Sequence, residues 1–312
     1  MQSENKSFLP VQLNQHPDIH VLYNMKAQLN SLYYTSYFIN DIICFKGKGI
    51  FMINQIQKKV LILALHAGEL MMKSGAEIYR VEDTITRIYK ACKIPYVEVF
   101  ATSTGIFLSL DEGSAYADMH TFIKRIKSTS IDLDKISKIN YFSREFATTD
   151  LSIDAGLAIL KDIANAKPYH LLLRILGAAL VSSFFALIFD GDIRDFFCSF
   201  VIGACSYTVS VLLDRIETNL FIRGFCCCSL ATFLALLTIS FGLGSNLSSI
   251  IIGSIMIFLP GMAITNAIRD TLAGDTLSGI SRGLEAIIVA ISLAAGVGVV
   301  LEIWVSLGGN MI

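Results

Sequence analysis

Charged residues are scarce in this 312-residue chain. Asp, Glu, Lys and Arg make up 16% of it, whereas 54% is hydrophobic and the mean hydropathy is +0.60. A soluble domain carries about 25% charged residues, so this composition argues against an ordinary cytosolic enzyme. The net charge of −1 argues against a nucleic-acid binder that depends on a basic surface, and we expect no nucleic-acid partner.

Lysine and histidine are absent from residues 171–312. That stretch holds six arginines and nine acidic residues, whereas residues 1–170 hold 19 Lys and Arg and 17 Asp and Glu. The difference predicts a soluble N-terminal part followed by a helical bundle in the lipid bilayer.

The seven cysteines lack the paired spacing of a disulfide framework. Cys226, Cys227 and Cys228 are consecutive in an apolar run. Neighbours on a helix point about 100° apart, so these three cannot bind one metal ion. We interpret them as small hydrophobic residues that face the membrane. The sequence also lacks a P-loop, so ATP hydrolysis is not supported and we expect no cofactor.

The N-terminal half divides into an arm and a domain. Residues 1–51 are open to two interpretations: a segment upstream of a true translation start near Met52, or a poorly ordered arm. Residues 52–167 indicate a cytoplasmic α+β domain. The pattern predicts a helix over 56–92, hairpin strands over 96–101 and 106–110, a third strand over 119–126, and helices over 132–146 and 152–166 with Asp132 and Ser152 as N-caps.

Residues 168–312 predict a domain of five transmembrane helices. Each apolar segment has about the 20 residues that cross about 30 Å of hydrocarbon. The segments are 170–189, 195–213, 222–242, 247–266 and 284–307. Arginines gather in the loops after the second and fourth segments, so the positive-inside rule places the N-terminus in the cytoplasm and the C-terminus outside the plasma membrane. The expected fold class is a multi-pass α-helical membrane protein with an N-terminal cytoplasmic α+β domain.

Small residues recur every four positions in two of the segments. They are Ala178, Ser182 and Ala186 in the first, and Ala290, Ala294 and Gly298 in the fifth. Such stripes let helix backbones approach closely. We favour packing within one chain over a subunit interface for both.

The fourth segment is interrupted at Pro260 and Gly261. Proline lacks the N–H that would donate to the carbonyl four residues earlier, and transporters use such breaks to build solute and ion sites. If the helix resumes, Asn266 and Asp270 share one face, and Thr265 aligns with Arg269.

A charged segment follows this break. Asp275 and Arg282 lie in a polar, glycine-spaced stretch, and Glu285 lies at the mouth of the fifth segment. Arg269 could hold a carboxylate, and Asp270 or Asp275 could carry a coupling proton. The alternative is that these charges mark a cytoplasmic loop and its ion pairs.

Two motifs resemble the threonine/serine exporter family. One is Gly68-Glu-Leu-Met-Met-Lys-Ser-Gly-Ala-Glu77 followed by Arg80-Val-Glu82; the other is Pro260-Gly-Met-Ala-Ile-Thr-Asn-Ala-Ile-Arg-Asp-Thr-Leu-Ala-Gly-Asp275 followed by Ser278-Gly-Ile-Ser-Arg282. Members are single long chains or two separate proteins, and this chain resembles the larger, YjjP-type subunit of the split form. The resemblance implies a small partner, a YjjB-like membrane subunit. It also implies threonine, serine or succinate as the exported solute.

The resulting hypothesis is a secondary exporter subunit in the plasma membrane, not an enzyme, that moves small carboxylate-bearing metabolites and forms an oligomer. The expected substrate pathway is lined by Pro260, Gly261, Asn266, Arg269, Asp270, Asp275, Arg282 and Glu285. One alternative is a membrane-tethered hydrolase built on His66 and Glu69, with His120 approaching from the sheet. Another is a regulatory subunit whose partner holds the whole pathway.

Overall fold

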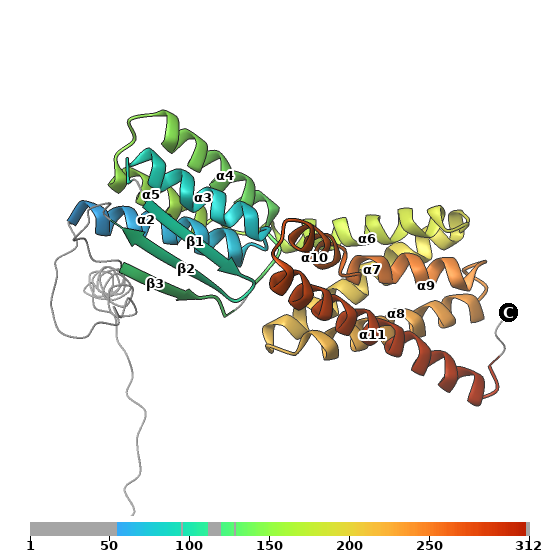
Figure 1. Cartoon of the computed structure of the whole chain (residues 1–312). Helices are drawn as coiled ribbons and strands as arrows, with labels where there is room; N and C mark the ends of the chain where they lie inside the picture. The colour runs from blue at the N-terminus through green and yellow to red at the C-terminus, as the bar shows by residue number, and fades with distance from the viewer. Residues whose placement is uncertain (1–54, 95, 112–119, 128, 310–312) are drawn as a thin grey trace, which may run out of the picture.

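The computed structural model describes residues 55–94, 96–111, 120–127 and 129–309. The interpretations of the N-terminal arm, residues 1–51, fall outside the described residues. The described chain forms an N-terminal domain and a helical bundle that lie side by side and meet at one junction (Figure 1).

The N-terminal domain packs helices against a three-stranded sheet. Its elements are α2 (Gln55–Lys73), α3 (Ile78–Ala91), β1 (Tyr96–Thr102), β2 (Gly105–Asp111), β3 (His120–Arg125), α4 (Leu133–Thr148) and α5 (Ile153–Ala164). The sheet is antiparallel in the order β1-β2-β3. The predicted hairpin, the third strand and both N-caps are confirmed, since Asp132 accepts from the Lys135 N–H and Ser152 accepts from the Ala155 N–H.

The prediction of one continuous helix over 56–92 is wrong. The chain turns between α2 and α3 because Gly75 adopts a left-handed conformation with φ +81°, which glycine adopts at little cost. Apolar residues keep a helical spacing on both sides of the turn, so periodicity alone conceals it. The turn matters because it faces the bundle.

One face of the sheet supplies the core of the domain. Ile106 and Leu108 of β2 are fully buried against helix residues that include Leu63, Met71 and Ile85. Strand side chains alternate between the two faces, so the neighbouring positions point away from the helices. Burial of these aliphatic side chains is the main source of the domain's stability.

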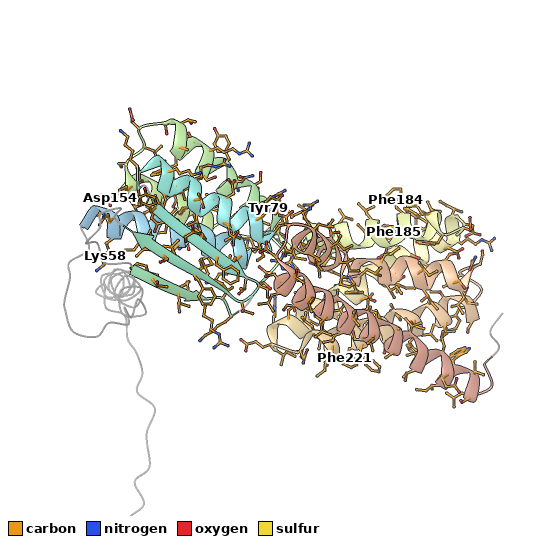
Figure 2. All side chains as sticks on the ribbon, viewed as in Figure 1. Lys58, Tyr79, Asp154, Phe184, Phe185 and Phe221 are labelled. Carbon is orange, nitrogen blue, oxygen red and sulfur yellow. The ribbon has the colours of Figure 1, made fainter. Side chains whose placement is uncertain are left out.

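The bundle consists of long apolar helices connected by short loops. They are α6 (Leu171–Ile188), α7 (Ile193–Arg215), α8 (Leu220–Ser240), α9 (Leu247–Ile255), η1 (Met256–Phe258), α10 (Gly261–Leu272) and α11 (Thr276–Ser306). Four of them, α6, α7, α8 and α11, are long and apolar enough to cross a membrane. Apolar side chains such as Phe184 and Phe221 lie on the outside of the bundle (Figure 2), as a lipid environment requires.

The fourth predicted span is broken, as Pro260 and Gly261 suggested. The run Leu247–Phe258 is followed by α10 at an angle of 57°, so the pair is either one bent span or a re-entrant loop. Helix α11 begins at Thr276, eight residues before the apolar segment predicted from 284. The pattern of apolar residues missed these first two turns because most of their residues are not apolar. Arg282 therefore lies on the same helix as Glu285 and not in a loop before it.

Of the two small-residue stripes, the one on α6 is buried and the one on α11 is exposed. Ala178, Ser182 and Ala186 are buried, and a Cβ on Gly253 of α9 would lie 2.6 Å from the Ser182 carbonyl oxygen. The prediction of packing within the chain is thus confirmed for α6. It is wrong for α11, where the stripe at 290, 294 and 298 is exposed and the helix instead buries Ser292 and Gly296.

The cysteine prediction also needs correction. Cys227 and Cys228 are fully buried in the bundle, and only Cys226 is partly exposed. The reason is that α8 packs against α7, α9 and α11, so few of its positions can face lipid.

Candidate functional site at the domain junction

The candidate site is the junction between the N-terminal domain and the bundle. On the domain side lie the α2–α3 turn and the β1–β2 turn; on the bundle side lie α10 and the start of α11 (Figure 1). Each of the two motifs contributes one side of this junction. Residues about 190 positions apart in the sequence are thereby brought into contact.

Asp270 of α10 is the most buried charged residue of the junction. Its side chain is fully inaccessible, and its Oδ1 accepts a hydrogen bond of 3.0 Å from the Ile78 backbone N–H. Ile78 begins α3, and Glu77 at the N-cap position makes no capping bond with its own side chain. The first N–H groups of a helix lack partners within the helix and carry partial positive charge. Asp270 therefore caps α3 from the other domain.

Arg282 completes the environment of Asp270. Its Nη1 lies 2.9 Å from Asp270 Oδ2, and its Nη2 donates a hydrogen bond of 2.8 Å to the Ala76 carbonyl oxygen. The Arg282 side chain is 12% exposed. One guanidinium thus links α11, α10 and the α2–α3 turn, and the loss of either partner would leave a buried charge uncompensated.

Asn266 and Arg269 bind the same turn. Asn266 Nδ2 donates to the Gly75 carbonyl oxygen over 2.9 Å. Arg269 forms an ion pair with Glu77, whose side chain is only 7% exposed and also lies 3.2 Å from Arg80 Nε. The predicted faces are confirmed: Asn266 and Asp270 are buried, whereas Thr265 and Arg269 are exposed.

Asp275 and Ser278 extend the contact to the sheet. The Asp275 N–H donates to the Asp270 carbonyl oxygen at the elbow between α10 and α11. Ser278 Oγ accepts a hydrogen bond of 3.1 Å from the Ser103 N–H in the β1–β2 turn. Burial raises the pKa of Glu82, and the negative charge of Asp275 raises that pKa further. The elbow thus brings a second carboxylate close to the domain.

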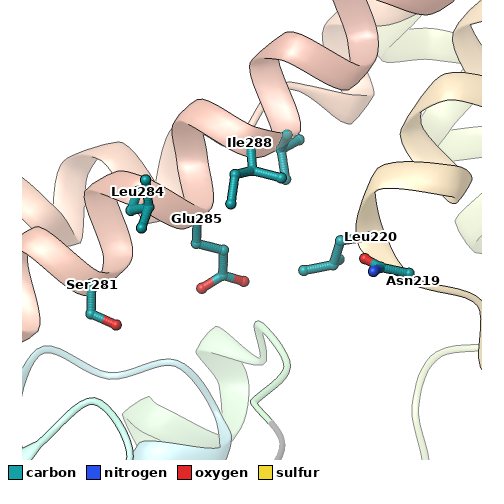
Figure 3. A pocket seen from close by; sticks show the side chains of 7 residues that line it. Asn219, Leu220, Ser281, Leu284, Glu285 and Ile288 are labelled. Atoms are coloured by element: carbon teal, nitrogen blue, oxygen red, sulfur yellow. The ribbon is translucent and has the colours of Figure 1, made fainter.

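Glu285 lies apart from the Asp270 cluster. It lines a pocket of about 300 Å³ between α11 and the start of α8, together with Asn219, Leu220, Ser281, Leu284, Ile288 and Val289. Figure 3 shows its carboxylate directed into the space between these two helices. A carboxylate beside an amide and a hydroxyl is suited to hold an ammonium group.

The structure thus brings Asn266, Arg269, Asp270 and Arg282 together at one turn and separates them from Glu285. Pro260 and Gly261 lie at the start of α10, where they break the helix without touching the turn. Sequence reasoning missed the partners on the domain side, above all Glu77 and Ser103. Glu77 stands in the first motif, but only the fold shows that the two motifs meet.

Glu69, the carboxylate of the hydrolase alternative, is bound in two ion pairs. Glu69 lies 2.7 Å from Lys73 Nζ and 3.5 Å from Lys124 Nζ. Burial lowers the pKa of His66, and the nearby Glu69 charge opposes this shift. Among the described residues no three His, Cys, Asp or Glu side chains are placed to hold a metal ion, and the side chain of His120 lies outside the described part.

Comparison with known proteins now identifies the chain. A family model described as "Putative threonine/serine exporter" matches residues 62–304, which include both sides of the junction. The chain belongs to the threonine/serine exporter family. It is also 22% identical over 241 residues to a curated Mycobacterium tuberculosis protein named "Probable threonine/serine exporter". The match covers 77% of this chain but only 45% of that relative. No solved structure matches.

Membership gives the junction a context. The exporter family is a transporter family and not an enzyme family, and the apolar helices agree with a membrane protein. The matched region contains the broken helix, the cap on α3 and the Glu285 pocket in one continuous stretch.

Proposed function

We propose that the chain is a subunit of a secondary exporter in the plasma membrane. Five spans, the fourth of them bent, carry a cytoplasmic N-terminal α+β domain and leave the C-terminus outside. The exported solutes are small carboxylate-bearing metabolites: threonine, serine or succinate. A YjjB-like small membrane subunit completes the pathway.

The observation that carries the proposal is the attachment of the bent α9–α10 pair to the domain. Arg269 is the cation that could bind a substrate carboxylate, and in this structure its partner is the carboxylate of Glu77. A substrate carboxylate would compete with Glu77 for the same guanidinium. Binding of substrate would then weaken the hold of the domain on α10, which offers a route from solute binding to helix movement.

The surroundings of Glu285, Asp275, Pro260 and Gly261 suggest a role for each of them in export. The Glu285 pocket would take the ammonium group of an amino acid, a group that succinate lacks. Asp270 or Asp275 would carry a coupling proton, since both are carboxylates of the segment behind the helix break. Pro260 and Gly261 would let α10 pivot relative to α9.

Efflux from proteoliposomes tests this function. The chain and its partner subunit are reconstituted and loaded with labelled threonine, serine or succinate. We expect Arg269→Ala and Asp270→Asn each to reduce efflux by at least about tenfold, since each removes a charged partner. Arg223→Ala is the control, because Arg223 of α8 pairs with Asp214 of α7, within the bundle. Unchanged efflux in both junction variants would refute the assigned site.

A second candidate is a regulatory subunit. It is favoured by the paired state of Asn266, Arg269, Asp270 and Arg282, which all bind protein groups in this structure. Efflux by the partner alone, with a change in rate but not in solute preference when this chain is added, would support regulation over a direct pathway role.

A further inference from the structure

Five serine hydroxyls in the bundle are buried without a hydrogen-bond partner among the described residues. One, on Ser292 of α11, lies against Gly224 of α8; the other four lie on α6, α7 and α9. They belong to Ser182 of α6, Ser199 and Ser206 of α7, and Ser254 of α9, and all four side chains are fully inaccessible. We call these four residues the serine seam. A buried hydroxyl without a partner costs about 1–3 kcal/mol, so five such groups in one bundle require an explanation.

Other hydroxyls in the same bundle are satisfied in the usual way. Ser183, Thr208, Thr232 and Ser240 each donate to the carbonyl oxygen four residues earlier, over 2.7–2.9 Å. This local bond is available to any serine or threonine on a helix. Ser183 is especially informative because it is as buried as its neighbour Ser182 and yet is paired. The four seam residues therefore differ from these neighbours in having no partner among the described residues.

The seam lies where three helices meet. Helices α6, α7 and α9 contact one another in all three combinations. A Cβ on Gly203 of α7 would lie 2.2 Å from Ser182 Oγ, so the Ser182 hydroxyl points directly at α7 between Ser199 and Ser206. Those two serines are seven residues apart and share one face of α7. The Ser182 hydroxyl thus points into the interface with α7, and Ser254 lies on α9, the third helix packed against both.

The seam connects the far end of the bundle with the helix break. At the far end, fully buried Asp195 accepts hydrogen bonds from the Ser245 and Asn246 N–H groups over 2.7 and 3.2 Å. At 1.5 Å per residue, the run Leu247–Phe258 rises about 18 Å, roughly half the hydrocarbon thickness. The break after Phe258 therefore lies near the depth of Ser206, which is about 20 Å along α7 from Ile193.

We propose that the serine seam between α6, α7 and α9 is the route by which a small hydrophilic solute crosses the bundle. The structure shows the closed state, in which Gly203 and Gly253 let the helices touch. When α9 moves away from α6 and α7, the four hydroxyls line a polar path and bind the solute and its hydration water. This inference rests on the proposed export function and extends it from the junction into the bundle.

The junction is placed to control this movement. Helix α9 continues through η1 into α10, and α10 is held by the domain through Asn266, Arg269 and Asp270. Release of α10 would free the inner end of α9, the helix that closes the seam. Opening of the seam would then follow solute binding at Arg269.

Water access to the seam is tested by cysteine labelling, which needs no transported solute. In a folded background with the native cysteines replaced by alanine, Ser182→Cys and Ser206→Cys are compared with Ser183→Cys. We expect a charged methanethiosulfonate reagent to label the seam positions at least about tenfold faster, because they face the interface that opens. Equal rates at Ser182 and Ser183 would overturn the proposal, even if the protein exports.

A second measurement keeps the native cysteines. Ser182→Ala and Ser206→Ala remove unpaired hydroxyls, so we expect a raised Tm together with an export rate about fivefold lower, the effect of one lost hydrogen bond to the solute. Ser183→Ala removes a paired hydroxyl, so its Tm falls while export is retained. If the seam variants export at the wild-type rate, the seam is not the route. If the wild type exports none of the three solutes while the seam positions are labelled, the proposed solutes are wrong. A water-accessible path along the seam is then still supported.

Discussion

Asp270 is bound by one backbone group and one charged side chain. One is the backbone N–H of Ile78 at the start of α3, and the other is the guanidinium of Arg282. The carboxylate is fully buried, so it cannot exchange either partner for water. A buried ion pair contributes little compared with a well-packed apolar pair, but removal of one partner is costly because the other charge stays buried.

Asp270→Ala should therefore lower the free energy of unfolding by about 3–5 kcal/mol. Asp270→Asn keeps an acceptor for the Ile78 N–H and should lose less. Thermal unfolding of the detergent-solubilised chain measures both. Asp154→Ala is the matched control, because Asp154 pairs with Lys59 at the surface with 71% of its side chain exposed. Equal stability of the Asp270→Ala and Asp154→Ala variants would contradict the assignment of a buried cap.

His66 gives the N-terminal domain a pH dependence. Burial lowers its pKa below the ordinary value of 6.5, so the folded state favours the neutral ring. The unfolded chain binds the proton first as pH falls, and stability is lost between pH 6.5 and the lower folded pKa. We expect the unfolding midpoint to drop over this window and His66→Gln to flatten the drop. A profile unchanged by the substitution would assign the pH dependence to other groups.

The turn between α2 and α3 shows where sequence reasoning reaches its limit. The strands, the caps at Asp132 and Ser152, and the break at Pro260 could be predicted because each depends on residues nearby in the chain. The turn at Gly75 could not, since glycine also occurs at close helix contacts. Its binding to α10 is a contact between distant segments, which no local pattern encodes.

Gly75→Ala should destabilise this turn by about 1–2 kcal/mol, the cost of a left-handed conformation for a residue with a Cβ. A Cβ at this position would also lie 3.2 Å from the Ser130 carbonyl oxygen. Gly177→Ala in α6 is the control, because a Cβ there has no atom within 4 Å and alanine favours a helix. Hydrogen exchange at the start of α3 should accelerate in the first variant and stay unchanged in the second.

The two halves of the molecule are joined by charges that a substrate could also use. Arg269 is half-exposed, whereas Glu77, its partner on the domain, is almost fully buried. In the proposed function, a carboxylate solute would therefore reach the guanidinium by displacing Glu77 from it. The small residues at 290, 294 and 298 of α11 are exposed on the surface of the bundle. This surface is available for the proposed partner subunit.

The proposed competition between Glu77 and a carboxylate solute predicts how the KM for that solute depends on Glu77. Glu77→Gln removes the competing charge, so the KM for a carboxylate solute should fall by about tenfold, equivalent to about 1.4 kcal/mol. Asp83→Asn is the control, because Asp83 pairs with Arg87 within α3. Solute should also speed hydrogen exchange at the Ile78 amide in the wild type, since release of α10 uncaps α3. A higher KM for Glu77→Gln would mean that Glu77 helps to form the binding site, and the competition proposed here would be wrong.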